Sequence, residues 1–262
     1  MNALHVQVKG IGLCSPHLAD FHALRGLLAG ELPAVATTRA HASALSPNER
    51  RRAPQSVLVA IEAASQAVAM SGYAASGLAC VFASAYGDQA TTDYMCNLLA
   101  RAPTELSPTR FHNSVHNAAA GYWTIATDCR ASSSATCAGN ASFGAGLLEA
   151  AVLACADHRP VLLVCSDDAG VGPLGELIGS TQFFGCALVL SPGTDTGIQL
   201  RLAVTASAPR HPPLPADCLA WMHSNPAAAA LPLLAMLATG AGDCVLGATQ
   251  LLGLHAQVET KA

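Results

Sequence analysis

The chain has 262 residues, enough for one large domain or two small ones. Hydrophobic residues make up 52% of it and charged residues 11%, and alanine alone occupies 53 positions. This composition excludes an intrinsically disordered protein. The net charge of −4, without a large basic cluster, argues against nucleic-acid binding, which depends on neutralising phosphates. Such an apolar chain must bury its surplus apolar surface within itself or against a partner.

The sequence predicts no membrane span and no signal peptide. The two longest apolar runs, 144–156 and 227–238, contain Glu149 and Pro232 and are shorter than the ~20 residues of a span. The first residues alternate between apolar and polar and include Lys9, where a signal peptide needs an apolar core. We therefore expect a cytoplasmic protein.

The ten cysteines are scattered, without a C-x-x-C pair, and most lie in apolar segments. This pattern favours reduced, buried thiols in a cytoplasmic protein over disulfides or a zinc site. Neither a metal nor a cofactor is expected. The cysteines are Cys14, Cys80, Cys96, Cys129, Cys137, Cys155, Cys165, Cys186, Cys218 and Cys244.

In the first half of the chain, strands and helices alternate. Ser46 and Glu49 fit a capping box with Pro47 at the first helical position, so a long helix should begin there, run to residue 70 and stop at Gly72. The run 78–85 is continuously apolar, as in a strand buried on both faces. The expected strands are 4–12, 78–85 and 133–138, and the expected helices are 17–29, 47–70, 88–101, 113–127 and 140–156.

In the second half, strands are expected at 161–166, 183–191 and 198–207. The Pro-rich connector 209–215 then marks a boundary. Beyond it, Asn225 should open a helix over 226–239 that ends at Gly240, followed by strands at 244–247 and 251–258. The alternation predicts an α/β fold with a largely parallel sheet. The expected division is a core over 1–207 and a residual helix and strands over 208–262, packed on the same core.

Several segments resemble the N-terminal half of a β-ketoacyl synthase, within the thiolase-like superfamily. They match that family's opening strand and Ser-Pro turn, its Leu-Leu-Ala-Gly segment, the segment across its dimer interface, and its "GDGAGMLVLE" strand without the acidic residue. The matching segments are 8–16, 27–30, 107–121 and 183–190. The resemblance implies a thiolase-like fold with a complete N-terminal half and a truncated C-terminal half.

The chain is most similar to a short ketosynthase-like branch, through the segments 49–52, 111–121 and 145–150. Members of that branch act as chain-length-factor-like partners of a true ketosynthase in bacterial type II polyketide systems, notably aryl-polyene pathways. The resemblance implies a non-catalytic subunit that shapes the acyl tunnel of a heterodimer. Its partners would be a full-length ketosynthase and, through that subunit, an acyl carrier protein.

The nucleophile position of the family is the most informative site. A ketosynthase needs a thiolate where a buried strand meets a helix N-terminus, because the helix dipole lowers the thiol pKa. Aligning Arg130 with the family arginine places Asn140 on the nucleophile and Ser142 on the serine two residues later. Asn140 cannot form a thioester, and asparagine is a favoured helix N-cap. The resemblance thus implies a lost nucleophile.

Cys137 is the rival nucleophile, because a three-residue gap in the strand would bring it into the same position. In that case the chain would be an independent acyl-transferring or condensing enzyme. The alternative for Cys137 is an inert thiol in a strand.

The histidines leave the catalytic set incomplete in either alignment. The family's condensing chemistry uses two imidazoles, or one and an amide, to stabilise an enolate. Beyond the connector the chain has His211, His223 and His255. The segment that begins at His223 faintly resembles the family's His-x-x-Gly-Ala-Ala-Gly helix start without its glycines, so His223 is at best a relic.

His112 and His116 are spaced to share one helix face, but without a third ligand they favour interface packing over a metal site. Arg50, Arg51 and Arg52 could contact an anion or a carrier protein, or lie on a solvated helix face. The residues expected at the partner interface or the acyl tunnel are Phe111, His112, His116, Asn117, Tyr122, Trp123, Ser142 and Phe143.

Overall fold

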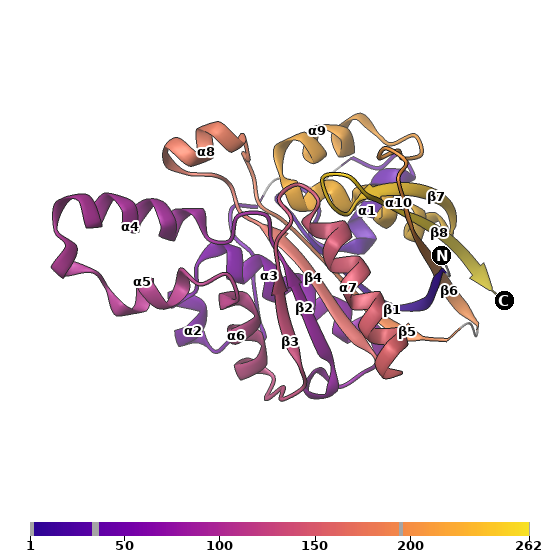
Figure 1. The fold of residues 1–262 in the computed structure, drawn as a ribbon, viewed down its shortest axis with the longest axis horizontal. Helices are drawn as coiled ribbons and strands as arrows, with labels where there is room; N and C mark the ends of the chain where they lie inside the picture. Colours follow the sequence, from indigo (N-terminus) through magenta and orange to yellow (C-terminus); the bar gives the residue numbers. More distant parts are fainter. Residues whose placement is uncertain (1–2, 33–36, 194–195, 262) are drawn as a thin grey trace.

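The computed structural model describes residues 3–32, 37–193 and 196–261. Within these residues, eight strands form one mixed sheet in the order β3-β2-β4-β5-β1-β6-β8-β7, with helices on both faces (Figure 1). The strands are β1 (Leu4–Cys14), β2 (Ala79–Ala83), β3 (Ser133–Thr136), β4 (Val161–Asp167), β5 (Phe184–Pro192), β6 (Gly197–Thr205), β7 (Ala241–Gly247) and β8 (Gly253–Lys261).

The expectation of a largely parallel sheet is wrong. Among the described strands, β2 pairs in parallel with β3 and β4, and the other five pairings are antiparallel. In the parallel part, helices connect the strands. The chain runs from β2 through α4, α5 and α6 into β3, and from β3 through α7 into β4. A short connection joins β7 to β8 as antiparallel neighbours, whereas β1 lies between β5 and β6 and pairs antiparallel with both.

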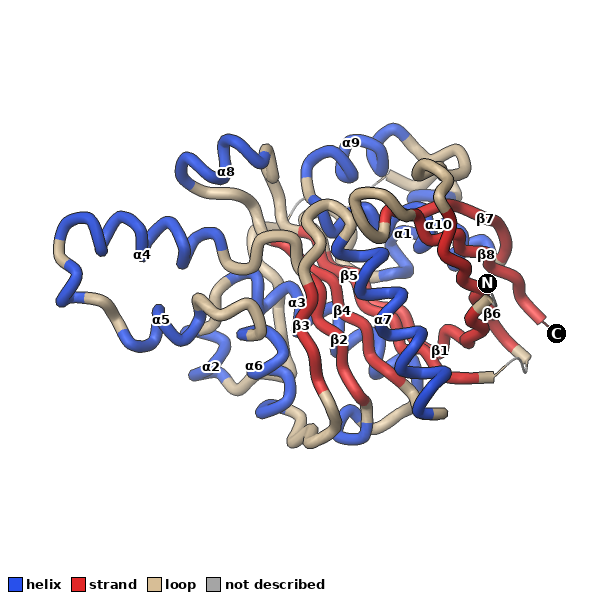
Figure 2. Tube along the Cα trace, viewed as in Figure 1, coloured by secondary structure: helices blue, strands red, loops and turns tan. Residues whose placement is uncertain are grey.

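Helices α3 and α6 pack on one face of the sheet, whereas α1, α7 and α10 pack on the other (Figure 2). The helices are α1 (Phe21–Leu28), α2 (Pro47–Arg52), α3 (Gln55–Ser71), α4 (Gln89–Arg101), α5 (Pro108–Asn113), α6 (Ala118–Ala126), α7 (Ser142–Asp157), α8 (Gly172–Ile178), α9 (Ala216–Ser224) and α10 (Leu231–Thr239), with short 3-10 turns η1 (Ala75–Gly77), η2 (Pro103–Glu105) and η3 (Pro226–Ala230).

The predicted capping box is confirmed. The Ser46 hydroxyl accepts from the Glu49 N–H at 3.4 Å, and the Glu49 carboxylate accepts from the Ser46 N–H at 3.2 Å. The single long helix, however, is wrong: α2 ends at Arg52 and α3 begins at Gln55. Pro54 breaks it, because proline has no N–H to donate and disfavours helical backbone at the residue before it. As predicted, the helix ends at Gly72, whose φ is +73°.

Other helix boundaries also differ from the expectation. The predicted helix over 113–127 corresponds to α6, which begins later, at Ala118, whereas α5, α8 and α9 are helices that the sequence did not predict. The predicted opening at Asn225 is confirmed, because its Oδ1 accepts from the Ala227 N–H at 2.8 Å, but the first turn there is η3.

The apolar core includes side chains from both sides of the Pro-rich connector. Leu233 on α10 and Leu254 on β8 belong to the same buried cluster as Leu13 on β1 and Leu147 on α7.

The segment Gly139–Asp157, which contains α7, is long and apolar enough to cross a membrane by length and composition alone. In the structure, α7 packs its buried side against β4 and β2 as a core helix.

Helices α4 and α5 project from the body on the side opposite the two termini (Figure 1). We call residues 89–113, which comprise α4, η2 and α5, the arm. Within α4, Gln89 and Thr91 are buried and the other residues are partly or fully exposed. The arm therefore offers a large surface that this chain does not cover.

Candidate functional site

The turn between β3 and α7 holds the predicted nucleophile position. Asn140 is exposed, and the residue that caps α7 is Ala141, without a side-chain hydrogen bond. The prediction that Asn140 caps this helix is therefore wrong. Instead, the Ser142 hydroxyl accepts from the Ala138 N–H at 2.9 Å and donates to the Gly139 carbonyl at 2.7 Å. Because Ser142 satisfies the turn, the Asn140 side chain is available to the surface.

A pocket of about 140 Å³ brings Asn140 together with His223, the two residues that the sequence placed in catalytic positions. The His223 Nδ1 lies 2.7 Å from the Leu219 carbonyl oxygen. A carbonyl only accepts, so Nδ1 carries the proton and Nε2 is the unprotonated nitrogen of the neutral ring. The described residues that line the pocket include no cysteine; they are Asn140, Ile178, Ser180, Met222, His223, Ser224, Asn225, Pro226 and Ala229.

Cys137 lies near this turn but does not line the pocket. It follows the last residue of β3, is exposed, and places its Sγ 3.2 Å from the Ala85 carbonyl oxygen. Since α7 begins at Ser142, the Cys137 thiol is not at the helix N-terminus, where a dipole would activate it.

Alkylation of the native chain should distinguish exposed from buried thiols. Burial raises the pKa of Cys14, Cys80 and Cys244 to about 12, which removes the reactive thiolate. We expect iodoacetamide to label Cys96 and Cys137 at rates within about tenfold of each other, because both are exposed. Peptide mass spectrometry over a time course measures these rates. Labelling of Cys137 far ahead of Cys96 would instead support a nucleophilic Cys137.

A buried carboxylate lies beneath this site, at the end of β4. Asp167 is 1% exposed, and its carboxylate accepts from the Ser84 hydroxyl at 2.7 Å, the Ala85 N–H at 2.9 Å and the Tyr86 N–H at 3.2 Å. Burial raises the pKa of the Asp167 carboxyl to about 6, although these hydrogen bonds oppose the rise. Asp167 is not among the site residues predicted from the sequence. The sequence feature that could have indicated it is the pair Asp167 and Asp168 at the carboxyl end of an otherwise apolar strand.

Stability should rise as the pH falls toward 5. The folded-state pKa of Asp167 lies above the ordinary value of 3.8, so the folded chain binds this proton more tightly than the unfolded chain. The resulting stability is complete below the unfolded pKa and is lost as the pH rises through about 6. Lowering the pH from about 7 to about 5 should add about 1 kcal/mol to the free energy of unfolding through Asp167.

Urea unfolding at both pH values measures this effect, with Asp167→Asn as the comparison. The variant should lack the gain in the free energy of unfolding that protonation of Asp167 contributes at the lower pH. The same pH dependence in both chains would assign the effect to other groups, among which Asp168 also has a pKa raised to about 6 by burial.

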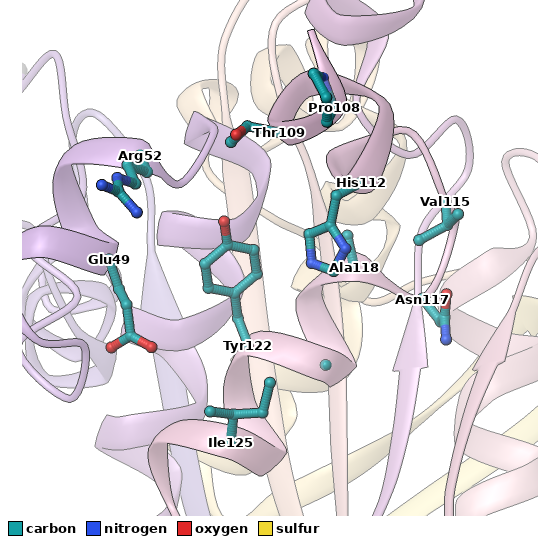
Figure 3. A pocket seen from close by; sticks show the side chains of 11 residues that line it. Glu49, Arg52, Pro108, Thr109, His112, Val115, Asn117, Ala118, Tyr122 and Ile125 are labelled. Atoms are coloured by element: carbon teal, nitrogen blue, oxygen red, sulfur yellow. The ribbon is translucent and has the colours of Figure 1, made fainter.

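His112 and His116 do not share a helix face, so that expectation is wrong. Helix α5 ends at Asn113, and His116 lies in the turn before α6. His112 lines a largely apolar pocket of about 510 Å³ between α2, α5 and α6, where its ring centroid lies 6.4 Å from that of Tyr122 (Figure 3). Among the described residues, no group of three or more His, Cys, Asp or Glu side chains is placed to hold a metal.

The other predicted interface or tunnel residues fall into two groups. Phe111 and Asn117 are exposed, and Tyr122 is partly buried with its hydroxyl donating to Asn113 Oδ1 at 3.2 Å. Trp123 and Phe143 are each 1% exposed, in the buried clusters on opposite faces of the sheet. Both side chains of the second group are therefore packed within the chain itself.

A groove of about 330 Å³ between α4 and α8 was not predicted. Thr92, Cys96 and Ala100 line it from α4, and Val171, Pro173 and Leu174 line it from the α8 side. Val171 and Leu174 are exposed apolar side chains. This groove could not be expected from the sequence pattern, because that pattern did not predict α8.

The sequence profile of the β-ketoacyl synthase N-terminal domain matches residues 29–246, which is most of the chain. The chain belongs to this family. The described strands and helices of this chain form the ketosynthase-like thiolase fold of that family. The fold class that the resemblance implied is therefore confirmed. A search among curated proteins found no match.

Solved structures share this β-ketoacyl synthase fold. One is a ketosynthase (ApeO) in complex with its chain length factor (ApeC) from Xenorhabdus doucetiae, with a TM-score of 0.73, 21% identity, and coverage of 97% of this chain and 99% of the matched chain. The ishigamide ketosynthase/chain length factor has a TM-score of 0.71, 13% identity, and coverage of 99% and 100%. A β-ketoacyl synthase from Burkholderia phymatum STM815 has a TM-score of 0.58 and 12% identity, with 78% of this chain but 64% of that chain covered.

Proposed function

We propose that the chain is a non-catalytic, chain-length-factor-like partner of a ketosynthase. The observation that carries this proposal is Asn140, which stands beside His223 in a pocket whose described lining has no thiol. An amide cannot form the acyl thioester of a condensing enzyme. The partner would supply the nucleophile and the histidines. The pathway we propose is cytoplasmic type II polyketide biosynthesis of the aryl-polyene type.

Chain length in the comparisons supports this role. The chain and its counterparts in the two ketosynthase/chain length factor complexes cover each other almost completely. By contrast, the chain spans 64% of the Burkholderia ketosynthase and 46% of a ketosynthase from the bacillaene synthase. The short counterparts come from heterodimers, which favours the same assembly here.

The partner surface that we propose comprises the arm, α6 and the edge strand β3. Leu99, Phe111, Val115 and Ile125 are exposed there, between 46% and 72%. An apolar surface of this kind marks a protein interface. Strand β3 ends the described sheet, and an unpaired strand edge is a template for pairing. The face of β6 and β8 away from α10 instead carries Arg201, Gln257 and Glu259, which suit water.

The groove between α4 and α8 is the part of this chain best suited to line an acyl tunnel. It is mostly apolar and belongs to the same arm that meets the partner. Filling it should shorten the acyl chain that the heterodimer can accommodate.

Ala100→Trp tests this expectation, because Ala100 lines the groove and is exposed enough to accept a larger side chain. We expect a shorter main product with unchanged assembly. Ala90→Trp is the matched control, an exposed alanine of α4 that does not line the groove. Mass spectrometry of the products measures the change. Unchanged product length in Ala100→Trp, or equal shortening in Ala90→Trp, would contradict the assignment.

Co-expression with a ketosynthase from the same genome tests the proposed function. We expect one-to-one co-purification and, after incubation with an acyl-loaded carrier protein, an acyl adduct on the ketosynthase and none on this chain. Intact-protein mass spectrometry resolves both. A stable monodisperse monomer with no affinity for a ketosynthase would rule the proposal out. An adduct on this chain at Cys137 would establish the alternative, an independent acyl-transferring enzyme.

The acyl carrier protein is expected to act through the ketosynthase. In a related complex, a type II acyl carrier protein is seen with its ketosynthase. Arg50, Arg51 and Arg52 lie on α2, and Arg52 lines the apolar pocket between α2, α5 and α6. They suit either an anionic partner or a solvated helix face.

A further inference from the structure

The arm joins the body of the chain at two ends, the turn before α4 and the segment after α5. Beyond its first turn, α4 packs against α5, η2 and α8 and makes no extensive contact with the sheet. The chain enters α4 through the turn 84–88, in which Gly87 has a φ of +62° and Asp88 caps the helix by accepting from the Thr91 N–H at 3.1 Å. This turn therefore holds the α4 end of the arm, whereas Tyr122 on α6 holds the α5 end by donating its hydroxyl to Asn113 Oδ1 at 3.2 Å.

The carboxylate of Asp167 is the main anchor of the turn. It accepts three hydrogen bonds, from the Ser84 hydroxyl and from the Ala85 and Tyr86 N–H groups. The Ser84 hydroxyl oxygen in turn accepts from the Gly87 N–H at 2.8 Å. Four donors of the turn are thus satisfied, directly or through Ser84, by one buried side chain. Hydrogen bonds to a charged group are about twice as strong as neutral ones.

The backbone of Asp167 is held by a hydrogen bond from the side chain of Asn225. The Asn225 amide donates to the Asp167 carbonyl at 3.0 Å and to the Gln182 carbonyl at 2.7 Å. Asn225 is 2% exposed and lines the Asn140 pocket. The same residue of β4 therefore joins the base of the arm to the wall of that pocket.

We propose that Asp167 is a positioning residue, whose carboxylate sets the orientation of the arm relative to the sheet. Where the arm serves as the partner surface, which rests on the proposed function, Asp167 also presets that surface for binding. A preset surface spares the ordering that binding would otherwise require.

Hydrogen exchange on the isolated full chain tests the positioning role without any partner. Asp167→Leu and Asp167→Asn both keep a side chain of four heavy atoms branched at Cγ, but only asparagine keeps an acceptor oxygen. We expect Asp167→Leu to speed exchange of the Ala85, Tyr86 and Gly87 amides and the first turn of α4 by at least about tenfold, since a lost hydrogen bond to a charge costs more than ~1.4 kcal/mol. Asp167→Asn should retain most of the protection, which a purely space-filling role would not explain.

Asp168→Asn is the matched control. Its carboxylate is also partly buried, yet its hydrogen bond is to the adjacent Ala169 N–H and not to the turn. Ser84→Ala is a milder second variant in case Asp167→Leu does not fold, and it should speed exchange of Gly87 in particular. Unchanged exchange in the turn, or an equal increase in β5, would overturn the proposal.

Affinity for the ketosynthase separates the two proposals. If both hold, Asp167→Leu should weaken binding by about tenfold, in proportion to the exchange effect. If exchange responds as expected but no ketosynthase binds the wild-type chain, the proposed function fails and the positioning role stands. If the wild-type chain binds a ketosynthase but exchange does not respond to Asp167→Leu, the positioning role fails and the proposed function stands.

Discussion

Replacing both Phe111 and Ile125 by glutamate should weaken binding to the ketosynthase by at least about 100-fold, because each carboxylate would be buried unpaired in an apolar contact. The two side chains are 56% and 72% exposed in the free chain, so the substitutions remove little internal packing. The fold should therefore survive. Calorimetric titration measures the affinity, and circular dichroism with a melting curve verifies the fold.

Leu251→Glu is the control for this double variant. Leu251 is 87% exposed, but it lies in the turn between β7 and β8, away from the arm (Figure 1). We expect wild-type affinity for this control. Tight binding by the double variant, or loss of binding in Leu251→Glu, would place the partner elsewhere on the chain.

Local sequence signals predicted local structure well. The capping box at Ser46 and Glu49 and the glycine stop at Gly72 are confirmed, because each depends on side chains within three residues or on one backbone conformation. Pro54 should have been recognised as a break, since its effect is equally local. The strand directions were not predictable in this way. Whether β4 pairs with β5 in parallel or antiparallel depends on the path of α8, which has no strong periodic signal.

The candidate site was predicted in part. Alignment to Arg130 identified Asn140, and a weak motif identified His223, and the structure places both at one pocket. Residue type alone could not separate Trp123 and Phe143, which are buried, from Phe111, which is exposed, because all three are aromatic. Asp167 was missed because its role is to bind backbone groups about eighty residues away. Such a pairing exists only after the sheet has formed.

Gly12→Ala should be among the most destabilising single substitutions, with a loss of about 3 kcal/mol or more in the free energy of unfolding. Gly12 lies on β1, directly beneath α3. An added Cβ would lie 1.9 Å from the Ala63 carbonyl oxygen and 3.0 Å from the Ala67 nitrogen. Both are backbone atoms of α3, so relief requires the helix to move away from the sheet. The apolar packing of α3 on β1 and β5 would be lost with that movement.

Gly77→Ala is the matched control, because Gly77 has no heavy atom within 4 Å of the added Cβ and needs no positive φ. Urea unfolding should give a much lower midpoint for Gly12→Ala, an unchanged slope, and a near wild-type midpoint for Gly77→Ala. Equal midpoints would mean that α3 can shift at little cost. The expected result would also explain why β1, which resembles the opening strand of the family, has a glycine at this position. The backbone of α3 lies so close to β1 there that a side chain has no room.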